Sequence, residues 1–343
     1  MRIAVFGAGA VGGHMAARLS AAGHDVSVIA RGANLDAIRD KGITLRIGDG
    51  VVHGRVHASD NPAELGRQDV VLVTTKANAL SPAAEAIGVL LEADTPVVFV
   101  QNGIPWWYAL RLTRGRPAPP DLSALDPGSR LRDVIGEART VGGVVYSSNE
   151  VIEPGVIRNH TPQRNNLIVG EIDDRPSPRV AMVRALLIEA GVASPDSDDI
   201  RTNVWQKLLR NISRSTVCCL VEQTMRDSLG KSEALREIAK EGTREGLKVA
   251  AWHGVRFDYD IDADFAPGSL FPPHKPSILQ DYELGRPMEV EALLRMPLAF
   301  AHVAKVPTPT LDVLVGLIAH RAAAKGLFAA EAGRTSTQSQ RRE

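Results

Sequence analysis

An ammonium, an amide and a hydroxyl group recur one helical turn apart in the second half of the chain. Lys207, Asn211 and Ser215 follow one another at spacings of four residues, so they share one face of any helix that contains them. A lysine can donate a proton or stabilise negative charge on a reacting oxygen, and the amide and hydroxyl can bind a polar ligand beside it. The solvated side of an amphipathic helix has the same spacing, so the spacing alone does not distinguish a ligand-binding face from a solvated one.

A glycine-rich segment near the start of the chain predicts a phosphate-binding turn between a strand and a helix. In such a unit Gly7 permits the tight turn, Gly9 lets a pyrophosphate approach the backbone, and Gly12 lets the helix pack on the strand. The helix N-terminus favours the anion. A turn without a ligand, and an FAD site, are the alternatives to a nicotinamide cofactor. The predicted cofactor contacts in this segment are Gly7, Ala8, Gly9, Ala10, Val11 and Gly12.

A basic residue follows the second apolar run, where NAD enzymes place an Asp or Glu for the ribose 2′-OH. The chain reads Ala30-Arg31-Gly32 there, and a guanidinium binds a 2′-phosphate through two hydrogen bonds. Arg31 therefore favours NADP, although an exposed arginine at a strand end would look the same. Lys76, after the third run, adds a second positive charge near that phosphate.

The elements that position these groups follow from the pattern of apolar residues. Short apolar runs alternate with helix-forming stretches in the first half of the chain, which predicts a parallel sheet covered on both faces. Two further runs, at 140–147 and 151–169, predict an antiparallel extension of that sheet. The first four runs are residues 3–6, 26–30, 70–74 and 96–100.

Helical periodicity dominates from Ile200 onward, so the fold class is α/β with two domains. We expect an N-terminal Rossmann dinucleotide-binding domain at 1–195, an all-helical substrate domain at 196–330 and a flexible tail at 331–343. The proline-rich segment 114–129 is interpreted as a surface insertion.

Composition excludes several classes of function. The 343 residues carry 40 Lys and Arg against 40 Asp and Glu, so no net field attracts nucleic acid or anionic lipid. The chain contains no run of about 18 apolar residues, the length that a membrane-spanning helix would need. Cys218 and Cys219 are adjacent and cannot build a disulfide framework or a four-ligand zinc site. We expect a cytoplasmic protein that needs no metal and has no nucleic-acid or membrane partner.

Two residues of the C-terminal half have simple structural explanations. Ser277 opens a Ser-Ile-Leu-Gln sequence that fits a helix capping box. Glu289 follows Pro287, where an acidic residue offsets the helix dipole.

The aromatic cluster 106–108 has three open interpretations: a lid or wall beside the cleft, a core contact, or a subunit contact.

Taken in order, these segments resemble the ketopantoate reductase (2-dehydropantoate 2-reductase) family. The ordered set covers nearly all of both domains and is more specific than any single motif. The matching segments are Gly7–Gly13, Ala30–Gly32, Thr75-Lys76, Gln101–Ile104, Trp205–Asn211 and Ser277–Asp281 through Gly285–Glu289.

The resemblance implies NADPH-dependent reduction of a 2-oxo acid to a 2-hydroxy acid in a cleft between the two domains. Lys207 then takes the place of the catalytic lysine and general acid, and Glu289 that of a glutamate that contacts the substrate hydroxyl. The implied substrate-binding residues are Asn211, Ser277, Asn102, which also lies near the nicotinamide ribose, and Ser215, which replaces a second asparagine that is common in the family. Arg31 and Lys76 match the cofactor-phosphate contacts.

The leading hypothesis is reduction of 2-dehydropantoate to pantoate for pantothenate and coenzyme A synthesis. The same chemistry on another small 2-oxo acid, and a non-catalytic NADPH sensor, are the alternatives. The sequence leaves the oligomeric state open, a homodimer included.

Overall fold

A seven-stranded sheet forms the N-terminal part of the structure, a computed structural model that describes residues 1–266 and 271–329. Neighbouring strands run parallel, except that β11 is antiparallel to β8. In spatial order the strands are β11 (Asn166–Glu171), β8 (Thr140–Tyr146), β7 (Val97–Phe99), β6 (Val70–Val73), β1 (Arg2–Phe6), β2 (Asp25–Ile29) and β5 (His57–Ser59).

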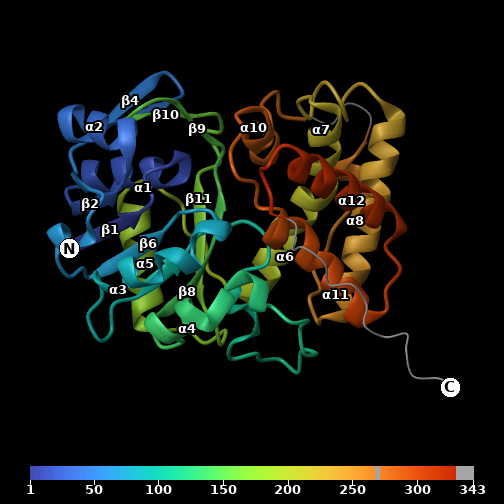
Figure 1. The fold of residues 1–343 in the computed structure, drawn as a ribbon, viewed down its shortest axis with the longest axis horizontal. Coiled ribbons are helices and arrows are strands. Elements are labelled where there is room, and N and C mark those ends of the chain that lie inside the picture. The colour runs from blue at the N-terminus through green and yellow to red at the C-terminus, as the bar shows by residue number, and fades with distance from the viewer. Residues whose placement is uncertain (267–270, 330–343) are drawn as a thin grey trace.

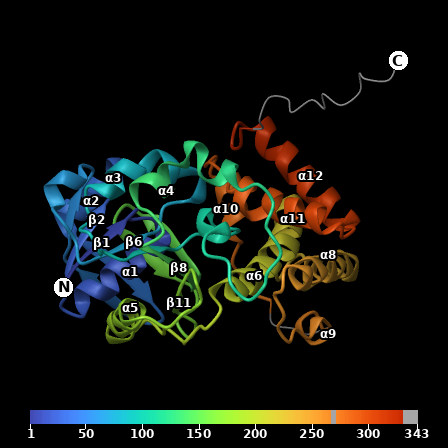
Figure 2. The same cartoon turned by 90° about the horizontal axis from the view of Figure 1, so that it is seen from below.

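Both faces of this sheet are covered, as the continuous apolar strands require. Along β1, Ile3 and Val5 belong to one apolar cluster, which includes α1 (Ala10–Ala21) and α5 (Pro178–Glu189), whereas Ala4 and Phe6 belong to the cluster on the other face. Figure 2 shows α3 (Ala84–Gly88) and α4 (Arg130–Val134) on that opposite side. The predicted parallel sheet is confirmed.

A second sheet of four strands covers the outer side of α1, and the sequence did not predict it. Its order is β4 (Gly50–Gly54), β3 (Ile43–Ile47), β10 (Val156–Asn159) and β9 (Asn149–Glu153). The predicted antiparallel extension is therefore wrong for β9 and β10, and β8 pairs parallel with β7. Close packing explains the arrangement: a Cβ atom on Gly13 of α1 would lie 2.8 Å from the Ile157 side chain.

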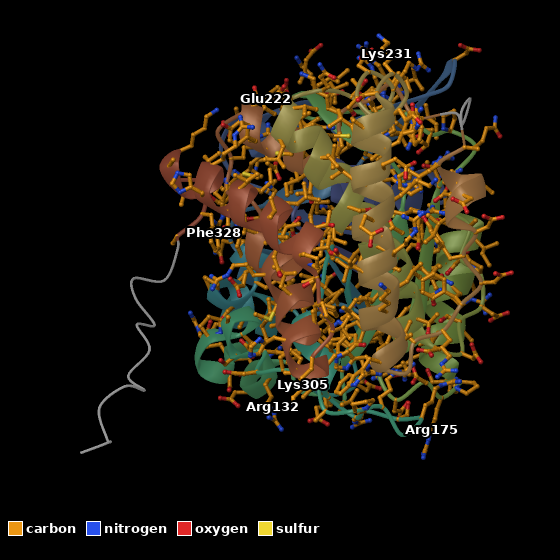
Figure 3. All side chains as sticks on the ribbon, turned by 90° about the vertical axis from the view of Figure 1, so that its right-hand side faces the viewer. Arg132, Arg175, Glu222, Lys231, Lys305 and Phe328 are labelled. Carbon is orange, nitrogen blue, oxygen red and sulfur yellow. The ribbon has the colours of Figure 1, made fainter. Side chains whose placement is uncertain are left out.

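Helices build the rest of the described chain, which confirms the predicted helical second part (Figure 1). In the view of Figure 3, α8 runs along the outer face downward from the end labelled at Lys231. The elements are α6 (Ile200–Arg210), α7 (Thr216–Val221), α8 (Glu233–Trp252), α9 (Ile261–Asp264), α10 (Ser277–Glu283), α11 (Met296–Ala304) and α12 (Pro309–Ala324), with π-helical turns at Asn211–Ser215 and Glu291–Arg295 and α2 (Gly32–Lys41) in the first part.

The predicted boundary at residue 195 falls between α5 and α6, and its position stays a prediction. The predicted tail, 331–343, lies outside the described residues. No helix among residues 1–266 and 271–329 is long and apolar enough to cross a membrane.

A buried arginine joins α6 to the sheet part. The Arg201 side chain is fully buried, and its guanidinium donates to the carbonyl oxygens of Tyr108 at 3.0 Å, Ile172 at 2.7 Å and Leu110 at 2.5 Å. It also lies 5.6 Å from the ring centre of Trp107. The aromatic cluster 106–108 is therefore a core contact, which excludes a lid.

The segment 114–129, interpreted from the sequence as a surface insertion, is exposed at most positions and is anchored in this junction by a few buried side chains. The side chain of Arg116 is only 1% exposed, and one of its nitrogens lies 3.2 Å from the carboxylate of Asp174. Leu122 and Leu125 are buried against the larger apolar cluster. The sequence could not show these anchors, because prolines and glycines mark irregular backbone without showing which of its side chains are buried.

Candidate active site

One cavity of about 1050 Å³ is lined by both parts of the molecule. It brings together most of the predicted site residues, although they come from turns, strand ends and helices far apart in the chain. α6 and α10, which line it, face the sheet part in Figure 1. The predicted residues in the lining are Gly9, Ala10, Val11, Lys76, Asn102, Lys207, Asn211, Ser215, Ser277 and Glu289, whereas Gly7, Ala8, Gly12 and Arg31 lie outside it.

The three motif glycines do different physical work. Gly7 has a φ of +107°, and a Cβ there would lie 2.7 Å from Thr75 Cγ2. A Cβ on Gly12 would lie 2.0 Å from the carbonyl oxygen of Gly7. A Cβ on Gly9, by contrast, would meet no atom within 4 Å. Gly7 and Gly12 are therefore required by packing, while the absent side chain of Gly9 leaves open space at the N-terminus of α1.

This end of the cavity fits the phosphates of a dinucleotide. Gly9 is the N-cap of α1 and makes no side-chain cap, and the first turn holds no acidic residue, so backbone N–H groups and the helix dipole favour an anion. Two buried polar atoms beside the turn, Thr75 Oγ1 and Gln101 Oε1, have no partner in the described part of the chain. Unsatisfied buried oxygens of this kind are typical of a ligand site.

Arg31 lies where the sequence predicted it, directly after β2. It is exposed and forms the N-cap of α2. Its assignment to a 2′-phosphate stays a prediction.

Lys207 is half-buried in the cavity wall and does not extend into bulk solvent. Its Nζ lies 5.9 Å from the ring centre of Tyr146, at the end of β8. Burial lowers the pKa of Lys207 to about 8, and the charge of Glu289 opposes this shift. The ammonium is therefore the major form at pH 7 and can lose its proton more readily than an exposed lysine.

Glu289 connects the helical part to two strand-end loops of the sheet part. Its Oε1 accepts a hydrogen bond from the backbone N–H of Ala77 at 2.9 Å, and the Asn102 side chain also hydrogen-bonds to it. Burial raises the pKa of Glu289, while these donors and the charge of Lys76 act in the opposite direction. Dipole compensation alone does not explain a carboxylate held in this way.

Lys76 follows β6 by three residues and binds a protein carboxylate. Its Nζ is 2.6 Å from Asp281 Oδ1 on α10 and donates to the Pro287 carbonyl at 3.0 Å. Lys76 thus bridges the two parts of the molecule. Its predicted contact with the cofactor phosphate is not tested by this arrangement.

The regular four-residue stripe predicted from Lys207 to Ser215 is interrupted. α6 ends at Arg210, and Asn211–Ser215 form a π-helical turn, which adds a residue to the turn and changes the directions of the following side chains. Asn211 and Ser215 still line the cavity with Lys207. Helical propensity gives no signal for such a turn, so the sequence could not locate it.

The second π-helical turn receives the loop that carries Asn102. Pro297 has no N–H to donate, and the N–H of Met296 donates to the backbone carbonyl oxygen of Glu291. The Ala292 carbonyl is thus free of helical partners, and it accepts the N–H of Ile104 at 2.8 Å. Gly103, which lies between Asn102 and Ile104 in the chain, has a φ of +82°, and a Cβ there would lie 2.3 Å from the carbonyl oxygen of Ala292.

Ser277 does not form the predicted capping box. The N-cap of α10 is Pro276, no side chain caps that helix, and Ser277 is exposed in the cavity lining. Sequence reasoning assigned no role to three further lining residues, Tyr146, Arg210 and Asp281. Nothing in their local sequence distinguishes them, because their position depends on pairing between distant elements. Within the described ranges, no group of three or more His, Cys, Asp or Glu side chains could hold a metal ion.

Comparison with known proteins agrees with this arrangement across both parts. Residues 3–116 match the family model described as ketopantoate reductase PanE/ApbA, and residues 199–322 match the model of its C-terminal part. The chain is 38% identical to the 2-dehydropantoate 2-reductase of Mesorhizobium japonicum, covering 96% of this chain and 100% of that one.

Solved structures share the same fold. The 2-dehydropantoate 2-reductase of Geobacter metallireducens matches with a TM-score of 0.80 and 28% identity over 93% of this chain and 99% of that one. A D-mandelate dehydrogenase solved with NADH and anilino(oxo)acetate matches with a TM-score of 0.78 over 96% and 100%, at 20% identity, which shows the fold alone. The chain therefore belongs to the ketopantoate reductase family and is a 2-dehydropantoate 2-reductase-like oxidoreductase.

Proposed function

We propose that the protein catalyses the NADPH-dependent reduction of 2-dehydropantoate to pantoate, with Lys207 as the general acid. The observation that carries this proposal is that Lys207 of the helical part and the glycine turn at Gly9 line one cavity. The similarity to the Mesorhizobium japonicum enzyme supports this choice of substrate.

The chemistry requires a proton donor beside a ketone. When bound, a nicotinamide would supply the hydride, and negative charge would develop on the ketone oxygen. Lys207, with a pKa of about 8, is largely protonated at pH 7 and donates to that oxygen. A positioned general acid contributes about 10²- to 10⁴-fold to the rate.

The remaining predicted residues hold the substrate. Glu289 contacts the hydroxyl group, and its orientation is fixed by Ala77 and Asn102. Asn211, Ser215 and Ser277 supply amide and hydroxyl groups from the helical part, which bind the polar groups of the 2-oxo acid.

NADPH is the proposed cofactor because Arg31 stands where NAD enzymes carry an acidic residue. Lys76 joins the same phosphate only if it leaves Asp281. A reducing, cytoplasmic location accords with the two free, buried thiols of Cys218 and Cys219.

Purified protein mixed with NADPH and 2-dehydropantoate tests the proposal by the loss of absorbance at 340 nm. We expect turnover that saturates with the 2-oxo acid and pantoate as the product. Turnover with other 2-oxo acids and none with 2-dehydropantoate would show that the protein has another substrate. NADPH binding without turnover on any 2-oxo acid would favour a sensor.

A further inference from the structure

The carboxylates that line the cavity each have a partner from the protein. Asp281 pairs with Lys76 at 2.6 Å, and Glu150 Oε2 lies 2.9 Å from His160 Nε2. Asp264 binds Arg214, and the carboxylate of Glu289 is held by the Ala77 N–H and Asn102. The protein therefore offers little free negative charge to a further cation in this wall.

Arg210 is a cation in the cavity wall that none of these carboxylates neutralises. It is the last residue of α6, is half-buried and lines the cavity, and no acidic partner binds its guanidinium among residues 1–266 and 271–329. Arg164 and Arg286 also line the cavity, but both are exposed. A partly desolvated guanidinium without a counter-charge gains most from an anionic ligand.

Arg214, one turn further on, cannot take that role. Its side chain is only 10% exposed and is bound by Asp264 and by the Tyr259 hydroxyl at 3.0 Å. Its guanidinium also lies 4.2 Å from the ring centre of Phe265. These contacts neutralise Arg214 and fix it against the protein.

Arg210 lies three residues after Lys207 on α6, which places the two side chains on one face of the helix, and both line the cavity. Its charge acts on the hydroxyl groups of both Tyr146 and Tyr259, lowering their pKa against the burial that raises it. Tyr146 is also the ring nearest to the Lys207 ammonium, 5.9 Å away. The Lys207 ammonium and the charge of Arg210 therefore both act on Tyr146, and Asn211 and Ser215 follow these two residues along the same helical segment.

We propose that Arg210 binds the carboxylate of the 2-oxo acid and is a specificity-determining residue of this site. The carboxylate next to the reacting ketone then lies on the Arg210 side of Lys207, and its hydrogen bonds to the guanidinium are charge-assisted. Ser277, a neutral hydroxyl group, adds a weaker contact. The inference rests on the proposed 2-oxo acid reduction and goes beyond it in naming the anion-binding group.

Arg210→Gln and Arg210→Lys test the proposal, with Arg286→Gln as a matched control at an exposed arginine of the same cavity. In Arg210→Gln we expect the KM for 2-dehydropantoate to rise about 10- to 100-fold, with kcat changed less than threefold. Arg210→Lys should recover part of the loss, because it keeps the charge but not the two-point geometry. The control variant, the NADPH Kd and the Tm should stay at wild-type values.

A KM within twofold of wild type in Arg210→Gln would overturn the proposal. An equal loss in both Arg210 variants together with a lower Tm would also overturn it, since that result indicates a structural role.

Binding measurements separate this proposal from the proposed function. Calorimetric titration of the NADP⁺ complex with a panel of 2-oxo acids gives their Kd without turnover. If the wild type binds a 2-oxo acid but does not reduce it, the proposed function fails, yet weaker binding to Arg210→Gln still supports the anion site. Equal binding to both proteins, or none to the wild type, contradicts it.

Discussion

Burial lowers the pKa of Lys207 to about 8, and Glu289 is the group whose charge opposes that shift. The two residues come from α6 and from the segment before the second π-helical turn. Their coupling sets the pH range in which Lys207 carries a proton.

Lys207 should impose an alkaline limit on activity near pH 8. Below this pKa the ammonium can donate its proton, and above it kcat/KM should fall about tenfold per pH unit. Initial rates from pH 6 to 10 measure this alkaline limb of the pH profile.

Lys207→Ala should lose about 10²- to 10⁴-fold in kcat and keep NADPH binding, and Lys248→Ala, at an exposed lysine on α8, is the control. Wild-type turnover in Lys207→Ala would contradict the assignment.

Glu289→Gln should move the alkaline limb to lower pH. Removing the carboxylate takes away the group that raises the pKa of Lys207, so the lysine loses its proton earlier. The same change should reduce kcat/KM by about 10- to 100-fold through the lost substrate contact. Glu291→Gln, whose carboxylate pairs with Arg295 at 3.1 Å, is the control. A limb that shifts to higher pH would show that another group titrates.

Gly9→Ala and Gly12→Ala should separate cofactor binding from folding. The Cβ of Gly9→Ala enters open space, so the Tm should not change, while the NADPH Kd rises by about tenfold or more because the methyl group occupies the phosphate site. Gly12→Ala forces a contact with Gly7 and should lower the Tm. Fluorescence titration and thermal unfolding measure both. Unchanged NADPH binding in Gly9→Ala would remove the phosphate from this turn.

Arg31→Ala should weaken NADPH much more than NADH. A charge-assisted contact with the 2′-phosphate is worth about 10- to 100-fold in Kd, and NADH lacks that group. Arg46→Ala, at an exposed arginine of β3, controls for the general loss of positive charge. Equal losses for the two cofactors would count against NADP preference.

Gly103→Ala should destabilise the protein more than Gly115→Ala. Both glycines have positive φ, so each substitution costs about 1–2 kcal/mol of backbone strain, but only Gly103 has a backbone oxygen in the way. Gly103→Ala should also lower kcat/KM, because it displaces the loop that carries Asn102 from the π-helical turn. Urea unfolding of the two variants compares the free energies, and equal values would show that the loop yields without cost.

Local patterns in the sequence were sufficient for β1, β2, β6, β7 and β8 of the large sheet and for the glycine turn, whereas β5 was missed. The apolar strands and Gly7 to Gly12 act over a few residues each, and the structure has them within one or two residues of the predicted positions. The small sheet was missed because β10 pairs with β3, more than 100 residues earlier, and no local signal specifies such a partner.

Long-range contacts limited the prediction of the site in the same way. The resemblance placed Lys207 and Glu289 together, but the spacing could not show that Lys76 would bind Asp281 or that Arg210 would lack a partner. Pro297 was a usable but inexact signal: in an α-helix a proline frees the carbonyl four residues earlier, that of Leu293, whereas the π-helical turn frees that of Ala292, which holds the Asn102 loop.

The buried guanidinium of Arg201 restricts how the helical part can move relative to the sheet part. Its three hydrogen bonds to the sheet part would have to break for the start of α6 to separate from β11. The bridge from Lys76 to Asp281 is a single ion pair whose lysine side is 35% exposed, so water can replace it at lower cost than the three buried hydrogen bonds. We therefore expect any opening that releases a product to break the Lys76 bridge before the Arg201 contacts.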